Sequence, residues 1–422
     1  MHPRSVFNSE PDFKQLAEEF ESFKKYVKIG TNNRGYIDFK DPQAVDFPID
    51  TLCPAVPNRL NYILWLEDLL DDTLSKEEKK CIKGIDIGVG ASCIYPLLGC
   101  ITNPSWSFLG TEINERSIQY ANENIKRNNL ETRITIKHNP NANKIFLPSL
   151  LEDDVKNYAF CMCNPPFYSS QEEIELGLLN KEIEPSSICT GSNNEMITEG
   201  GEFGFVKSMI LESVILKKKI RWYTSMIGLK RTIRPLIRVL EDQQIYNYAV
   251  TSFTQGKTVR WAIAWSFYLE RPISAYTIES WNPVYQFQIK LPKDINHIFE
   301  GIKHILDDLE IKYDKIEQDS TKTIILHCNA EKNTWSRAAR RQKAKKQKLS
   351  HYQEEEKEKA TNSPFFIFKL IISASSQQTE SNFQIVWIEG GHKAQFEGFW
   401  SHLKKRIEEH CGIHKGTSFS SK

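Results

Sequence analysis

The chain has 422 residues, a formal net charge of +1 and 40% apolar residues. This length allows two or three domains, and this composition excludes an intrinsically disordered chain. No apolar run reaches the roughly 18 to 20 residues that span a bilayer, and the N-terminus carries no apolar signal-peptide core. The nine cysteines are scattered and form no CxxC pair, which favours a reducing compartment over a disulfide framework. We therefore expect a protein that stays inside the cell and does not bind membranes.

The first 60 residues combine a short helical pattern at 13–27 with irregular, proline-rich segments. We interpret residues 1–60 as an N-terminal flap or extension. From residue 61 to residue 285, helix-like and strand-like segments alternate, which predicts βα units in a doubly wound parallel sheet, an α/β fold. The expected elements are a helix at 61–70, a strand at 83–88, a strand at 105–113, a helix at 115–129, a strand at 133–138 and a strand at 158–164.

A different pattern follows and predicts a smaller α+β domain at 286–422. A run of basic and then acidic residues at 331–362 interrupts this domain, and we interpret it as a flexible linker. The expected elements are a strand at 284–291, a helix at 295–309, strands at 311–318 and 322–328, strands at 365–375 and 383–389, and a helix at 396–410.

The segment "GIDIGVGAS" at 84–92 is the first that indicates chemistry. A β-branched strand ends at Asp86, and Gly88 and Gly90 form a tight turn where backbone can approach a ligand closely. Glu112 ends the next expected strand, where a carboxylate can accept hydrogen bonds from ribose hydroxyls. The pattern indicates a cofactor that contains adenosine, either a dinucleotide or S-adenosylmethionine. The alternative is a turn glycine pair with a surface glutamate.

The segment "NPPF" at 164–167 distinguishes between these cofactors. An exocyclic aromatic amine is a poor nucleophile, so an enzyme must hold its two hydrogens and aim its lone pair at the methyl donor. Asn164 offers a side-chain carbonyl and Pro165 a backbone carbonyl, while Pro165 and Pro166 fix the loop and Phe167 can stack on the base. Such positioning can supply roughly 7 to 11 kcal/mol, which removes the need for a strong general base. The alternative is a proline-rich strand exit with a core phenylalanine.

Cys161 and Cys163 alternate along the same apolar strand. We interpret them as core residues, with a zinc site as the alternative. No metal site is expected in the chain.

Five segments in order resemble a methyltransferase-like family. Its eukaryotic members methylate an adenosine in U6 small nuclear RNA, and its bacterial relatives methylate an adenosine of large-subunit ribosomal RNA. The resemblance covers about residues 10 to 270. The segments are "GIDIGVGASCIYPLLG", "FCMCNPPF", "EGGEFGFVKSMI", "LKKKIRWYTSMIGLK" and "TVRWAIAWSF".

This resemblance implies a Rossmann-like class I methyltransferase that binds S-adenosylmethionine, with the adenine of the substrate held by residues 164–167. Ser92 follows the glycine turn and is a candidate for cofactor binding. The alternative is a structural role, in which Ser92 caps the next helix. The segment after Val45 is shorter than in the family, so the flap is expected to be shortened. "HNPNANKIF" at 138–146 also departs from the family, which leaves Asn143 as the candidate for the adenine end of the cofactor. The predicted cofactor-binding residues are Arg59, Asp86, Gly88, Gly90, Ser92, Glu112, Asn143 and Asn164.

Two basic stretches indicate RNA binding. Residues 216–238 interleave Lys and Arg with Trp222 and Tyr223, a mixture that contacts phosphates and stacks on bases. The basic half of the expected linker, at 337–348, can hold RNA or serve as a nuclear localisation signal, and a solvated surface is the alternative for both stretches. The candidate RNA-binding residues are Lys217, Lys218, Lys219, Arg221, Lys230, Arg231, Arg337, Arg340, Arg341, Lys343, Lys345 and Lys346.

The sequence thus predicts an RNA adenine-N6 methyltransferase that uses S-adenosylmethionine, with U6 small nuclear RNA as its substrate. The alternatives are a ribosomal RNA adenine methyltransferase, a protein glutamine methyltransferase, a dehydrogenase and a catalytically idle RNA-binding protein. The C-terminal domain is expected to bind RNA. We expect a monomer in the nucleus, with the cytoplasm as a second location.

Overall fold

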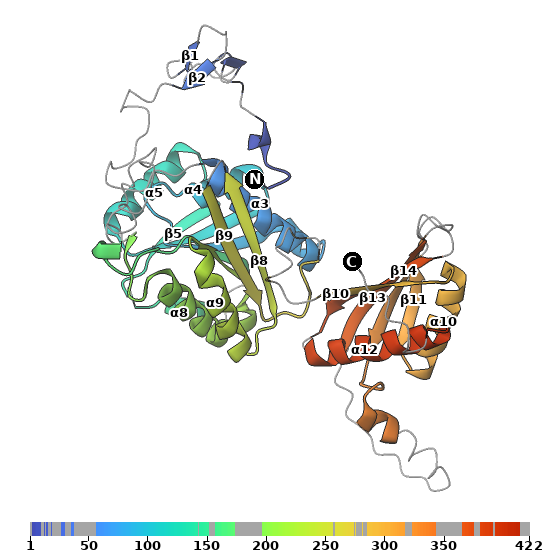
Figure 1. Ribbon diagram of the computed structural model, residues 1–422. Coiled ribbons are helices and arrows are strands. Elements are labelled where there is room, and N and C mark those ends of the chain that lie inside the picture. Colours follow the sequence, from blue (N-terminus) through green and yellow to red (C-terminus); the bar gives the residue numbers. More distant parts are fainter. Residues whose placement is uncertain are drawn as a thin grey trace. The chain divides into compact units, whose positions relative to one another are not determined.

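The chain folds into two compact units (Figure 1). The first comprises Met1–Tyr268 and Ser274–Asn282, and the second comprises Leu269–Ile273 and Pro283–Lys422. Among the described residues, no helix combines the length and the apolar composition needed to cross a membrane. The computed structural model describes residues 2–9, 12, 14–15, 18, 27–29, 35–37, 56–141, 143–151, 157–173, 196–255, 258–273, 275, 281, 285–316, 323–342, 365–374, 380–390 and 393–413.

A seven-stranded sheet forms the centre of the first unit, in the order β5-β4-β3-β6-β7-β9-β8. The strands from β5 to β7 are parallel, and β9 and β8 add an antiparallel edge. The predicted doubly wound α/β fold is confirmed. The strands are β3 (Ile82–Ile87), β4 (Trp106–Glu112), β5 (Ile134–His138), β6 (Tyr158–Cys163), β7 (Ile220–Ile227), β8 (Asn247–Gln255) and β9 (Thr258–Ser266).

Helices cover both faces of this sheet (Figure 1), so each face carries its own apolar core. Apolar residues of α3, α4 and α5 pack in one core, and those of α8 and α9 pack in the other. Cys161 and Cys163 are 0% and 2% exposed in the second core, which confirms that they are core residues. The helices are α3 (Val56–Thr73), α4 (Ile94–Thr102), α5 (Glu115–Arg127), α8 (Gly201–Leu216) and α9 (Lys230–Asp242).

Helix α3 begins at Val56, five residues before the predicted domain boundary at residue 61. Pro57 stands at its start, where a missing backbone N–H is not needed for a helical hydrogen bond. The boundary of the predicted N-terminal flap therefore falls inside a helix. The short strands β1 (Val27–Ile29) and β2 (Gly35–Ile37) pair with each other, and the rest of residues 10–55 lies almost entirely outside the described residues.

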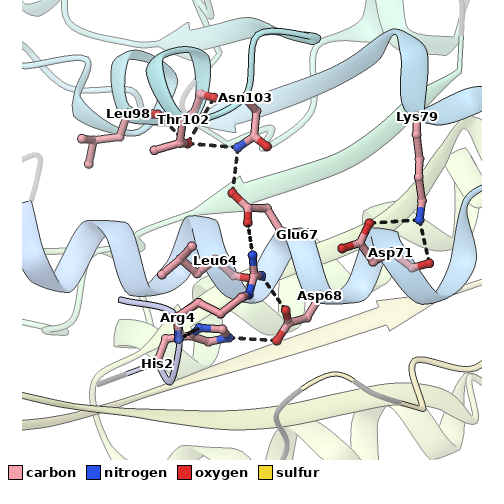
Figure 2. Close-up of polar contacts among 11 residues, drawn as sticks. His2, Arg4, Leu64, Glu67, Asp68, Asp71, Lys79, Leu98, Thr102 and Asn103 are labelled. Carbon is pink, nitrogen blue, oxygen red and sulfur yellow. Dashed lines mark hydrogen bonds and ion pairs between the residues drawn. The ribbon is translucent and has the colours of Figure 1, made fainter. Parts of the chain in front are cut away.

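Residues at the start of the chain are attached to α3 (Figure 2). The buried His2 ring lies 2.8 Å from a carboxylate oxygen of Asp68, and the His2 backbone N–H donates to the side chain of Asn61 at 2.9 Å. The Arg4 guanidinium bonds both Glu67 and Asp68, at 2.6 Å each. This end of the predicted flap is therefore fixed to the helix that also carries Arg59.

Replacing Asp68 with Ala is expected to lower the free energy of unfolding of the first unit by about 1 to 3 kcal/mol, because two hydrogen-bonded donors lose their acceptor. Burial alone would raise the pKa of Asp68, but the hydrogen bonds from His2 and Arg4 outweigh it and the pKa lies below its usual value. The contribution of Asp68 is therefore present above the pKa of the unfolded chain and is lost as the pH falls below about 4. Urea unfolding at several pH values measures it.

Asp71→Ala is the matched control for this variant, since Asp71 lies on the same helix, is 66% exposed and pairs only at the surface with Lys79. It should change stability by less than about 1 kcal/mol. Equal effects of the two variants at neutral pH would contradict the role given to Asp68.

The second unit is a five-stranded antiparallel sheet, in the order β10-β14-β13-β12-β11, with α10 and α12 packed on one face. Residues along β13 alternate between buried and partly exposed, as expected for a sheet with one covered face. All the predicted elements of this α+β domain are confirmed. They are β10 (Gln286–Leu291), α10 (Ile295–Asp308), β11 (Lys312–Ile316), β12 (Thr323–Ala330), β13 (Phe366–Ala374), β14 (Ser381–Glu389) and α12 (Lys393–His410).

Two boundaries in this region differ from the prediction. Residues 269–273 belong to the second unit, because Arg271 is 2% exposed and its guanidinium lies 4.0 Å from the ring centre of Trp387. The predicted linker at 331–362 begins too early, since Trp335 is 3% exposed and packs against Phe399 in the core. Residues 343–362 of the predicted linker lie outside the described residues.

Candidate active site

The turn between β3 and α4 has the backbone conformation that its glycines allow. Gly88 and Gly90 have φ angles of +70° and +66°, in the left-handed region that disfavours other residues. The Gly88 and Val89 N–H groups donate to the carbonyl of Thr111, which joins this turn to the end of β4. A Cβ added to Gly88 would meet no atom within 4 Å. The turn therefore leaves space beside its backbone at the carboxyl edge of the sheet.

Glu112 ends β4 and holds the same turn. It is 9% exposed, and one carboxylate oxygen accepts the Gly90 N–H at 2.9 Å. The other oxygen accepts the N–H groups of Ile113 and Asn114 at 2.8 and 3.0 Å. Glu112 therefore lies at the pocket and also fixes the backbone that shapes it, a second role that the sequence did not indicate.

Asp86 is buried at the end of β3, with 1% exposure. Burial and then the nearby charge of Glu112 raise the pKa of Asp86 well above its usual value, and the charge of Arg59 opposes them. Its Oδ2 atom has no hydrogen-bond partner among the described residues. Such an atom is a candidate acceptor for a polar ligand group, because a buried oxygen without a partner is unfavourable.

One pocket brings together residues from α3, the ends of β3, β4 and β6, and α8. Asp86 does not line this pocket and lies behind its wall. The predicted cofactor residues that line it are Arg59, Gly88, Gly90, Ser92, Glu112 and Asn164. The lining residues that the sequence analysis missed include Tyr95, Thr111, Ile113, Asn114, Ser117, Asn139, Lys144 and Phe205.

The loop after β6 places "NPPF" at the border of this pocket. Asn164 and Pro166 line the pocket and are half-buried, and Pro165 is buried. Among the described residues, none is hydrogen-bonded to the Asn164 side chain. Phe167 does not line the pocket and packs beside Gly228 at the end of β7. The loop thus presents an amide to the pocket and an aromatic ring beyond it.

Comparison with known proteins assigns the family. The profile of the Methyltransf_10 family, described as RNA methyltransferase, matches residues 1–269. The chain belongs to this family. Two curated relatives of this chain are similar over most of its length. The RNA N(6)-adenosine-methyltransferase METTL16 of Homo sapiens is 36% identical over 391 residues, which cover 83% of this chain and 69% of the relative. The U6 small nuclear RNA (adenine-(43)-N(6))-methyltransferase of Schizosaccharomyces pombe is 35% identical over 389 residues, which cover 90% and 93%.

Solved structures are also similar to the methyltransferase. The hMettl16 catalytic domain in complex with MAT2A 3'UTR hairpin 1 has a TM-score of 0.55 and 41% identity, covering 64% of this chain and 96% of that chain. The N-terminal domain of human METTL16 in complex with SAH has a TM-score of 0.50 and 38% identity, covering 64% and 99%. Both agree with the Rossmann-like class I fold predicted for the first unit.

The structure disagrees with one predicted cofactor residue, Asn143, and with the capping alternative considered for Ser92. Asn143 is exposed and does not line the pocket. The same segment contributes Asn139 instead, which is 5% exposed and donates to the carbonyl of Lys144 at 2.7 Å. Ser92 does not cap α4, because the capping position is held by Cys93 with no side-chain hydrogen bond. Ser92 keeps its predicted place in the pocket wall.

Three of the residues predicted to face RNA are instead structural. Trp222 and Tyr223 are 0% exposed, because β7 lies between β6 and β9 with helices on both faces. Arg221 is 8% exposed, and its guanidinium donates to the carbonyl of Thr73 at 2.8 Å and to Glu78 at 2.6 Å. These side chains cannot stack on bases or contact phosphates in this fold.

The lysines and arginines that flank β7 lie at opposite ends of this strand, and so at the amino and carboxyl ends of the parallel strands. Lys217, Lys218 and Lys219 precede β7, and Lys230 and Arg231 follow it. Because β6 and β7 are parallel, the residues after β7 share an edge with the "NPPF" loop, and the residues before it lie at the far edge. Lys230 and Arg231 therefore lie at the same edge as the pocket, with Arg231 paired to Glu173 at 3.5 Å, and their RNA contact stays a prediction.

The second basic stretch lies in the second unit and is described in part. Arg337, Arg340 and Arg341 are exposed on a short helical segment after Trp335. Burial, and then the charges of Arg340 and Arg406, lower the pKa of His402, and the charge of Asp308 opposes them. Lys343, Lys345 and Lys346 lie outside the described residues.

Replacing Arg337, Arg340 and Arg341 with Gln is expected to weaken RNA binding and to flatten the plot of log affinity against log salt by about 0.7 to 0.9 per lost phosphate contact. Preference for the target RNA over scrambled RNA should persist, because phosphate contacts carry no base information. A salt titration with both RNAs measures this. The control variant replaces Lys312 and Lys332, whose charges are paired with Glu331 and Glu310 at 2.5 and 2.8 Å. An unchanged salt slope would show that the three arginines do not contact phosphates.

Proposed function

We propose that this chain transfers a methyl group from S-adenosylmethionine to the exocyclic N6 amine of an adenosine in RNA, and that its substrate is U6 small nuclear RNA. The observation that carries the proposal is the Asn-Pro-Pro-Phe loop after β6, which borders a pocket formed by the glycine turn and Glu112. The names of the curated relatives support both the reaction and the substrate. Membership of an RNA methyltransferase family argues against the dehydrogenase and the protein glutamine methyltransferase.

The residues of the pocket fit S-adenosylmethionine. Glu112 has an oxygen with one described donor and therefore spare capacity to accept from ribose hydroxyls. Arg59 is the cationic group of the pocket wall on α3 and suits the carboxylate of the methionine part. The open space beside Gly88 leaves room for a ligand, whereas Asp86 is buried and does not line the pocket. When bound, this cofactor supplies a methyl group activated by a sulfonium centre.

Residues 164–167 act on the acceptor amine. The Asn164 side-chain carbonyl and the Pro165 backbone carbonyl accept one amine hydrogen each, which directs the nitrogen lone pair toward the cofactor pocket. Consecutive prolines restrict the backbone, so the two acceptors are held in place before the substrate arrives. Phe167, beyond the pocket wall, stacks on the adenine once the nucleotide is extruded from its neighbours. The site therefore works by positioning and needs no strong general base.

Methyl transfer from labelled S-adenosylmethionine tests the substrate. The purified chain is offered U6 RNA, a large-subunit ribosomal RNA fragment and a scrambled U6 RNA. We expect labelling of U6 RNA and little labelling of the other two. Labelling of ribosomal RNA alone would favour the ribosomal alternative, and binding of U6 RNA without any labelling would favour an idle RNA-binding protein.

The nuclear location and the monomeric state stay predictions. The basic block at 337–348 supports the former, and a fluorescent fusion with and without these charges would test it.

A further inference from the structure

Phe167 rests directly against a glycine. A Cβ added to Gly228 would lie 2.7 Å from Cδ1 and 3.0 Å from Cε1 of the Phe167 ring, closer than real Cβ contacts. Gly228 is the residue after β7, so the end of this neighbouring strand supports the ring. Any displacement of Gly228 would therefore move or tilt Phe167.

Glu202 determines where Gly228 lies. Its side chain is 2% exposed and extends from the first turn of α8. One carboxylate oxygen accepts the Gly228 N–H, and the other accepts the Leu229 N–H at 3.3 Å. Leu229 is the N-cap residue of α9 and has no side-chain cap of its own. Glu202 thus supplies, from another helix, the acceptor that the start of α9 lacks.

The start of α8 also contacts the backbone of the chain at Phe167 and Ser169. Gly201 has a φ of +59°, and a Cβ there would lie 3.3 Å from the Ser169 nitrogen and 3.6 Å from the Phe167 carbonyl oxygen. Just before α8, the Thr198 N–H donates to the carbonyl of Tyr168 at 3.0 Å, and the Tyr168 N–H donates to the carbonyl of Met196 at 3.0 Å. The segment that begins α8 therefore holds the backbone next to Phe167 as well as Gly228, the glycine in contact with its ring.

We propose that Glu202 is a positioning residue for methyl transfer, which holds Gly228 against the Phe167 ring and so fixes the orientation of the ring on which the target adenine stacks. This inference rests on the proposed function, because the position of Phe167 affects methyl transfer only if its ring stacks on the substrate base. Glu202 itself does not line the cofactor pocket. Its effect passes through Gly228 and Phe167.

A carboxylate is required at this position because two backbone donors converge on it. Glutamine has one acceptor oxygen, so its NH2 group would face one of the two N–H donors. Glu202→Gln therefore keeps the shape of the side chain and weakens its bonds to the Gly228–Leu229 turn and to the Thr232 side chain in the first turn of α9. Gly228→Ala disturbs the same contact from the other side, because the added methyl group meets the Phe167 ring.

A double-mutant cycle on the full chain tests the proposal, with kcat, the KM for RNA, S-adenosylmethionine affinity and Tm measured for each variant. We expect Glu202→Gln to lower kcat by about 10²-fold, the size of effect that a misplacement of about 1 Å can cause. S-adenosylmethionine affinity should stay unchanged, since the pocket wall is intact. In a Phe167→Ala background, Glu202→Gln should cause no further loss of kcat, because the ring it positions is gone. Glu199→Gln is the control, since Glu199 is exposed just before α8.

Two results would overturn different claims. If Phe167→Ala lowers kcat and Glu202→Gln lowers it again by its full factor, Glu202 acts independently of the ring and this inference is wrong. If Phe167→Ala leaves kcat unchanged, the stacking role in the proposed function is wrong. If Tm and cofactor binding show that Glu202→Gln does not fold, the same double-mutant cycle is measured with Gly228→Ala and Phe167→Ala. Additive losses of kcat in that cycle would also overturn the inference.

Discussion

Asn164→Ala is expected to lower kcat for RNA methylation by about 10²- to 10³-fold, the loss seen when one preorganised hydrogen-bonding group is removed from a transition state. The structure explains why the loss should appear in kcat. The Asn164 amide lines the pocket without a described protein partner, so its removal leaves no buried group unpaired in the free enzyme. Stability and affinity for S-adenosylmethionine should therefore change little.

Single-turnover methylation at saturating RNA and cofactor isolates this chemical step. Asn143→Ala is the matched control, because it removes the same amide from an exposed position outside the pocket. The control should retain wild-type turnover. Near-normal turnover by Asn164→Ala would refute the role of Asn164 in holding the amine.

Glu112→Ala is expected to weaken S-adenosylmethionine binding by about 1 to 3 kcal/mol, which corresponds to roughly 5- to 150-fold in affinity. Two effects combine in this variant. Ribose hydroxyls lose an acceptor, and the N–H groups of Gly90, Ile113 and Asn114 lose the carboxylate that orders the glycine turn. Glu112→Gln keeps one acceptor oxygen and should give a smaller loss.

Isothermal calorimetry measures both variants, with Glu115→Ala as a control at an exposed position three residues along the chain. Unchanged cofactor affinity in Glu112→Ala would place the ribose elsewhere. Tight NAD binding by the wild-type chain, without S-adenosylmethionine binding, would instead support a dehydrogenase.

The elements of the second unit and the six elements expected in the first follow closely from sequence periodicity. Helices α4, α8 and α9 and strands β7, β8 and β9 were not among the expected elements. The same local pattern misled the analysis at Trp222 and Tyr223. Aromatic rings among lysines and arginines suggested an RNA surface, but β7 is buried on both faces by its place in the sheet. A nearly continuous apolar run is typical of a central parallel strand, and "IRWYTSMI" departs from it at Arg221, Thr224 and Ser225, all of them buried.

The pocket residues that lie at the ends of parallel strands could be predicted from the sequence. Gly88, Gly90, Glu112 and Asn164 each follow from the rule that ligands bind at the carboxyl edge of a parallel sheet. Thr111, Asn114 and Asn139 lie at the same edge, and the rule applied fully would have found them.

Phe205, Glu202 and Gly228 are different, because their relation to the "NPPF" loop arises from contacts between segments far apart in the sequence. Neither composition nor spacing carries a signal for such contacts. The support that Glu202 and Gly228 give to Phe167, and the place of Phe205 in the pocket wall, are visible only in the folded chain.

The most direct test of the account is the position of the methyl group on the RNA. U6 RNA is incubated with the chain and S-adenosylmethionine, digested to nucleosides and analysed by mass spectrometry against standards for adenosine methylated at N6, N1 and C2. The account predicts N6-methyladenosine from the wild-type chain and its near absence with Asn164→Ala. A methyl group at another position of adenosine or on another base, or equal N6-methyladenosine from both proteins, would contradict it.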